Sequence, residues 1–146
     1  ININGGIDRS NISKNKDLVL LLPENPKKSA NDIQTQINTQ IDKDISVIIT
    51  DSMTRPYRSG VTNFAIASSN IQSLIDLKGE EDIFGNTLHA TEIAIADELA
   101  AAAGLLMGQG NDMKPVVIIK GFDRSNYSVN NAYDLIVNKD EDLYRF

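Results

Sequence analysis

Oxygen-bearing side chains gather at three places in the sequence where they could bind hard cations or phosphate. Carboxylate, hydroxyl and amide oxygens are the usual protein ligands of magnesium and manganese. Glycines beside such residues let backbone N–H groups approach a phosphate. Each of these patterns also occurs in turns and loops that bind nothing. The three places are Asp8 and Asn11 after a Gly-Gly pair, Asp51 and Ser52 after a β-branched run, and the loop of Met107, Gly108, Gln109, Gly110, Asn111, Asp112, Met113 and Lys114.

Other catalytic chemistries lack the residues that they need. The chain has no cysteine and a single histidine, His89, which excludes thiol catalysis and histidine-rich zinc sites. Serine–histidine catalysis would depend on His89, which we place at the start of an apolar helix, where a structural histidine is the more common case. The sequence contains neither a Gly-x-x-x-x-Gly-Lys-Ser/Thr loop nor a Gly-x-Ser-x-Gly elbow.

The charge balance restricts how phosphate could be held. With 14 basic and 20 acidic residues the net charge is −6, and no cluster of lysine and arginine stands out, so we expect no nucleic-acid partner. An acidic chain must recruit phosphate locally, through cations, backbone N–H groups or a few arginines. Arg55 and Arg58 could bind phosphate or carboxylate with paired hydrogen bonds, or could be solvated loop charges.

Length and composition predict one globular domain over residues 1–146. Hydrophobic residues make up 41% of the chain and charged residues 23%, as in soluble proteins. No apolar run reaches the length that spans a bilayer, and the N-terminus lacks the pattern of a secretory signal, so we expect a cytoplasmic protein without a membrane partner. The start at Ile1 suggests a processed chain or part of a longer one.

Hydrophobic patterns predict the elements that must position these residues. The apolar run 18–22 is typical of a buried strand. Ser29 is a typical helix N-cap. The spacing of Ile33, Ile37 and Ile41 predicts a helix face that packs on the core. The alanine-rich segment from about His89 to Met107 predicts a helix buried on several sides, with a left-handed Gly108 at its end. Further strands are expected at 45–50, 63–67 and 115–119, and a short helix at 132–137.

Strands and helices mix without strict alternation, which favours an α+β fold. A doubly wound sheet is the alternative, but no glycine-rich turn between a strand and a helix supports it.

Several short motifs follow one another along nearly the whole chain. They are Gly5-Gly-Ile-Asp-Arg-Ser-Asn11, Leu20-Leu-Leu-Pro-Glu24, Ile48-Ile-Thr-Asp-Ser52, Arg55-Pro-Tyr-Arg58, Ala90-Thr-Glu-Ile-Ala-Ile-Ala-Asp-Glu-Leu-Ala-Ala-Ala-Ala103, Met107-Gly-Gln109 and Glu141-Asp-Leu-Tyr-Arg145. In wording and order they resemble the C-terminal part of the coenzyme F-420:L-glutamate ligase family, also called the F-420:gamma-glutamyl ligases.

The resemblance implies a GTP-dependent ligase that forms an amide between L-glutamate and deglutamylated coenzyme F-420, with further γ-linked glutamates possible. It implies an acyl-phosphate intermediate and two divalent cations, magnesium or manganese, with K⁺ as a further candidate. It also implies an intertwined homodimer with a mixed, largely antiparallel sheet and packed helices.

Carried over position by position, the resemblance assigns roles to the polar residues already named. Asp8 and Asp51 look like the catalytic pair and the ligands of one cation, and Ser52 and Gln109 like ligands of the second. Asn11 and the residues from Met107 to Lys114 look like GTP contacts.

The chain departs from the family pattern in three respects. Ser52 replaces a usual threonine and keeps the hydroxyl, and Tyr57 replaces a usual tryptophan. Family members also carry a substantial N-terminal part, which holds part of the nucleotide site and is missing before residue 1. Two alternatives therefore stand beside the ligase. One is a non-catalytic fragment that only dimerises and binds cofactor; the other is a sister GTP-dependent ligase with another carboxylate acceptor.

Overall fold

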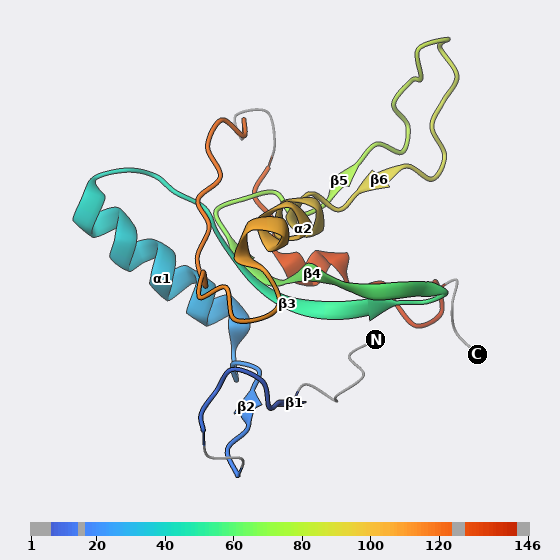
Figure 1. The fold of residues 1–146 in the computed structure, drawn as a ribbon. Coiled ribbons are helices and arrows are strands. Elements are labelled where there is room, and N and C mark those ends of the chain that lie inside the picture. The colour runs from blue at the N-terminus through green and yellow to red at the C-terminus, as the bar shows by residue number, and fades with distance from the viewer. Residues whose placement is uncertain (1–6, 15–16, 124–127, 143–146) are drawn as a thin grey trace.

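Two helices packed on a two-stranded hairpin form the body of the protein (Figure 1). The computed structural model describes residues 7–14, 17–123 and 128–142. Every strand pair within those ranges is antiparallel, so the α+β expectation is confirmed there and the doubly wound alternative is wrong. The intertwined dimer stays a prediction. The elements are β1 (Ile7–Asp8), β2 (Leu20–Leu21), α1 (Pro26–Ile41), β3 (Val47–Arg55), β4 (Arg58–Ser69), β5 (Ile75–Asp76), β6 (Glu92–Ile93), α2 (Ile95–Met107) and the 3-10 helix η1 (Ala132–Leu135).

The β3–β4 hairpin is longer than the hydrophobic pattern indicated. β3 begins at Val47, inside the β-branched run expected at 45–50, and continues to Arg55; β4 runs from Arg58 to Ser69 and so extends the expected 63–67, mainly at its start. Pro56 and Tyr57 form the turn, with Tyr57 at a φ of 57°. We had expected Asp51 at the end of a strand, but it lies in the middle of β3.

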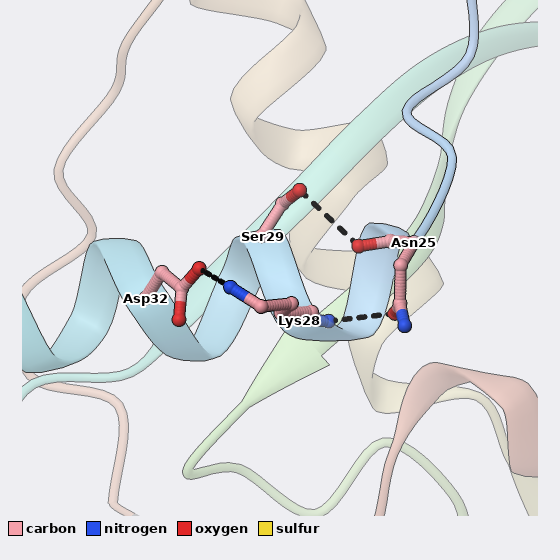
Figure 2. Close-up of polar contacts among 4 residues, drawn as sticks. All are labelled: Asn25, Lys28, Ser29 and Asp32. Carbon is pink, nitrogen blue, oxygen red and sulfur yellow. Dashed lines mark hydrogen bonds and ion pairs between the residues drawn. The ribbon is translucent and has the colours of Figure 1, made fainter.

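Helix α1 begins earlier than Ser29, the expected N-cap. The cap is Asn25, whose side chain accepts a hydrogen bond from the Lys28 backbone N–H at 2.9 Å, and Pro26 occupies the first turn, where its missing N–H costs nothing. The Ser29 hydroxyl instead donates to the Asn25 carbonyl, and Lys28 pairs with Asp32 one turn on (Figure 2). An Asn-Pro pair is thus the stronger start signal in this segment.

Three apolar segments are less buried than expected. In α1 the buried residue is Ala30, whereas Ile33 and Ile41 are 42% and 46% exposed. The run 18–22 is exposed throughout, and only Leu20 and Leu21 pair as a strand, with β1. The run 115–119, expected as a strand, belongs to no strand. Strand propensity becomes a strand only where a neighbour offers hydrogen bonds and an apolar face, and the described residues supply none for 115–119.

Helix α2 contacts the hairpin through alanine. It begins at Ile95, not near His89, which lies in the excursion between β5 and β6 that projects from the body (Figure 1). Ala96 and Ala100 are buried, but Leu105 and Leu106 are exposed, so the helix is covered on one side and not on several. Among the described residues, no helix combines the length and apolar character needed to cross a bilayer.

Asp97 in the first turn of α2 ties the helix to β4. Its Oδ1 accepts a hydrogen bond from the Ala65 backbone N–H at 2.9 Å, next to a register shift of the hairpin at Ile49/Thr50. Burial raises the pKa of the Asp97 carboxyl above its ordinary 3.8, although the Ala65 bond opposes the shift.

Asp97→Ala should destabilise the fold by about 1–3 kcal/mol, because it leaves a half-buried N–H without an acceptor. Asp97→Asn keeps the acceptor and should be at least as stable as the unchanged protein at pH 7. The folded state holds the Asp97 proton to higher pH than the unfolded chain, so this carboxyl makes stability fall as pH rises from about 4 through the raised pKa. Urea unfolding at pH 4 and pH 7 tests both points; an Asn variant as unstable as Ala at pH 7 would contradict them.

Candidate functional site

Hydrogen bonds connect the three polar places predicted from the sequence. The side chain of Asn11 donates from Nδ2 to the carbonyl of Gly110 at 2.9 Å, which joins the Asp8 turn to the loop after α2. In the same loop, Gln109 donates from Nε2 to Oδ1 of Asn63 at 2.6 Å. Asn63 lies directly opposite Ser52 in the hairpin. The loop thus bridges the Asp8 turn and the strand pair that carries Asp51 and Ser52.

The Asp8 turn holds its carboxylate ionised and exposed. Oδ1 of Asp8 accepts hydrogen bonds from the Ser10 backbone N–H at 2.8 Å and from the Ser10 hydroxyl at 2.7 Å. These bonds, chiefly the backbone one, favour the charged form and lower the pKa of Asp8 below 3.8. An ionised carboxylate in contact with solvent is open to a cation.

Asp51 and Ser52 are half-buried and point to opposite faces of β3, because side chains alternate along a strand. Ser52 shares its face with Asn63, which also reaches Thr50 and the helix α2. Asp51 lies opposite Phe64, and its Oδ1 accepts a hydrogen bond from the Ser52 backbone N–H at 2.8 Å. The structure therefore brings Ser52 and Gln109 to one common neighbour, Asn63, and joins neither Asp51 nor Asp8 to that neighbour directly.

The loop after α2 depends on a glycine at its first position. Gly108 has φ 75° and ψ 178°, a combination that is essentially restricted to glycine and differs from the left-handed helical end we had expected. A Cβ at Gly108 would lie 1.9 Å from Oδ2 of Asp112, and the same oxygen accepts a long hydrogen bond of 3.4 Å from the Gly110 backbone N–H. The loop thus curls around the Asp112 carboxylate.

The remaining predicted residues make fewer contacts with the rest of the candidate site. Asn111, Met113 and Lys114 are exposed in the loop. Arg55 and Arg58 are partners across the hairpin turn, and the Arg55 guanidinium donates to the Ser59 carbonyl at 3.2 Å, which gives Arg55 a structural role in the turn.

The sequence did not reveal Asn63. It is 7% exposed, and it stands between the predicted ligands Ser52 and Gln109. A polar residue within an apolar strand pattern was the available signal, since a buried amide needs partners, but the pattern does not say which ones.

Comparison with known proteins identifies the family. The family model described as "F420-0:Gamma-glutamyl ligase" matches residues 1–121. The chain belongs to this family. Relatives named "Coenzyme F420:L-glutamate ligase" include one from Methanocaldococcus jannaschii, 45% identical over 144 residues, which are 97% of this chain and 55% of that protein. Another, from Methanosarcina mazei, is 47% identical over 121 residues, 83% of this chain and 47% of that protein. The chain spans about half the length of the curated relatives it matches.

The donor set of this F420-0:gamma-glutamyl ligase family member suits a hard divalent cation. Asp8, Asp51, Ser52 and Gln109 offer only oxygen as ligand atoms, and hard cations prefer oxygen. Among the described residues neither carboxylate forms a salt bridge with a lysine or arginine, in contrast to Asp32, which pairs with Lys28, and to Asp76 and Glu92, which pair with Lys78. Within the described ranges no three His, Cys, Asp or Glu side chains gather to hold a metal, so a cation here needs hydroxyl or amide oxygen as well.

Proposed function

We propose that the protein containing this chain is a GTP-dependent ligase that forms an amide between L-glutamate and deglutamylated coenzyme F420. The name carried by relatives at about 45% identity supports the substrates. The observation that carries the proposal is the loop after α2. It is linked to the Asp8 turn by the Asn11–Gly110 bond and to the β3–β4 hairpin by the Gln109–Asn63 bond.

The chemistry that we infer has two steps. A carboxylate oxygen of the acceptor attacks the γ-phosphorus of GTP, so that GDP leaves and an acyl phosphate forms. The amine of glutamate then attacks the acyl carbon, loses a proton and displaces inorganic phosphate to form the amide. Further glutamates would be joined through γ-linkages by the same sequence of steps.

The chain's own residues have separate tasks in this scheme. Asp8 and Asp51 would hold one divalent cation, and Ser52 and Gln109 a second; bound magnesium or manganese would neutralise charge on the transferred phosphoryl group. Asn11 and the backbone N–H groups of the loop from Met107 to Lys114 would contact GTP. The net charge of −6 supports this division of labour, because an acidic chain attracts a triphosphate poorly without cations.

The proposal predicts a requirement for four components. The complete natural protein, given deglutamylated coenzyme F420, L-glutamate, GTP and Mn²⁺ or Mg²⁺, should release GDP and phosphate and add the mass of one glutamyl residue to the cofactor. Leaving out any one component, or adding a chelator, should stop formation of the glutamylated cofactor, which mass spectrometry detects, and sustained release of phosphate. If an amide product forms only when another carboxylate acceptor replaces deglutamylated coenzyme F420, the protein is instead a sister ligase.

A further inference from the structure

Asn63 is a buried amide in β4 that joins side chains from three elements. Its Nδ2 lies 3.7 Å from Sδ of Met107 and 3.5 Å from Oγ1 of Thr50, while its Oδ1 accepts from Nε2 of Gln109 at 2.6 Å. Gly104 of α2 lies against the same group, because a Cβ there would be 2.9 Å from Cγ of Asn63. The Asn63 carboxamide is therefore enclosed by α2 and by the neighbouring strand.

These contacts determine which end of each amide points where. A thioether sulfur accepts hydrogen bonds but cannot donate one, so Met107 takes the nitrogen end of the Asn63 amide. The oxygen end of Asn63 then faces Gln109. Since that oxygen can only accept, Gln109 must present its Nε2, which leaves its Oε1 for another partner.

We propose that Asn63 is a positioning residue, which fixes the Gln109 carboxamide so that its oxygen is presented to the candidate cation site. The inference rests on the proposed function, in which Gln109 is a cation ligand. Gln109 is exposed, and without this bond either end of its amide could face the site. Groups that orient a metal ligand in this way contribute strongly to affinity.

The decisive experiment measures Mn²⁺ binding to the complete natural protein by calorimetry, beside thermal unfolding without metal. Asn63→Ala should weaken one Mn²⁺ site by about 10- to 100-fold. Asn63→Asp should bind Mn²⁺ at least as tightly as the unchanged protein, because a carboxylate still accepts from Gln109. A purely structural role predicts the reverse order, because the Asp variant buries a charge in place of a neutral amide.

A double-mutant cycle separates positioning from general damage. Gln109→Ala should weaken the same Mn²⁺ site, and adding Asn63→Ala to it should have no further effect, because Asn63 acts through Gln109. Asn130→Ala is the matched control. That amide also joins distant segments, through bonds to Ser73 and Leu74, so its loss should lower the unfolding temperature and leave Mn²⁺ affinity unchanged.

The outcomes distinguish the inference from the function on which it rests. Unchanged Mn²⁺ affinity in Asn63→Ala, beside a loss in Gln109→Ala, overturns the positioning role and leaves the ligase proposal standing. If the protein without substitutions neither binds Mn²⁺ nor makes product, both the positioning role and the ligase proposal are overturned. If the Asn63 variants do not fold, Met107→Leu keeps the volume of the side chain and removes the sulfur acceptor. It should weaken the same site by a smaller factor, and full Mn²⁺ affinity in that variant would count against the proposal.

Discussion

Asp51→Asn should lower the rate of amide formation by about 100- to 1,000-fold, the equivalent of a few kcal/mol of lost transition-state stabilisation. Asparagine has the shape of aspartate, and its Oδ1 can still accept the 2.8 Å hydrogen bond from the Ser52 backbone N–H. The fold should therefore survive while the negative charge that would hold the cation is lost. Steady-state rates with saturating GTP and glutamate, together with Mn²⁺ titration, measure the effect.

A second carboxylate provides the control for Asp51. Asp32 lies on the exposed side of α1 and pairs with Lys28, and such surface pairs contribute about 0–1 kcal/mol to stability. Asp32→Asn removes the same charge from the protein but should leave the rate unchanged. Full ligase activity in Asp51→Asn would remove Asp51 from the site, whatever its effect on stability.

Gly108→Ala should weaken GTP binding about tenfold or more, because an alanine at φ 75° and ψ 178° costs about 1–3 kcal/mol, and 1.4 kcal/mol is a factor of ten in affinity. The new methyl group would also collide with the Asp112 carboxylate, 1.9 Å away. The loop would then have to rearrange, and its N–H groups would lose the arrangement proposed to contact phosphate. Binding of a non-hydrolysable GTP analogue, measured by calorimetry, tests this.

Gly79→Ala is the matched control for Gly108. Gly79 lies in the β5–β6 excursion and also has a positive φ, 93°, but a methyl group added there would have no atom within 4 Å. The change should cause similar backbone strain and leave GTP binding unchanged. The double variant Gly108→Ala/Asp112→Ala removes the collisions with Oδ2 and Cγ of Asp112, but it keeps the Cβ of residue 112, 2.9 Å from the new methyl group, and the strained φ. Partial recovery of GTP affinity in that double variant would assign part of the loss to the collision, and unchanged GTP affinity in Gly108→Ala alone would contradict the role of the loop.

Local patterns in the sequence predicted local structure well. Residues 47–50 of the β-branched run expected at 45–50 lie in the hairpin, because such side chains favour extended backbone. The alanine-rich segment became α2, although it starts only at Ile95, because Glu92 and Ile93 pair with β5 instead. The start of α1 was misplaced because Ser29 resembles a cap as much as Asn25 does, and only the fold shows which side chain meets a free N–H.

Structure that depends on distant parts of the chain was predicted less well. The apolar runs 18–22 and 115–119 have the composition of buried strands, but composition does not state what covers them. The first run is exposed throughout, and the second is exposed except for the half-buried Val117. The candidate site shows the same division. Its segments could be named from their residue types, whereas the role of Asn63 depends on Met107 and Gln109, more than forty positions away.

The bond between Asn11 and Gly110 has a consequence for how the site assembles. It spans 99 positions of the chain, and the hairpin and both helices lie between the two segments that it joins. One exposed hydrogen bond contributes little against the entropy of closing so long a loop. We therefore expect that the Asp8 turn can separate from the loop without unfolding the hairpin, and that a nucleotide in contact with both would hold them together.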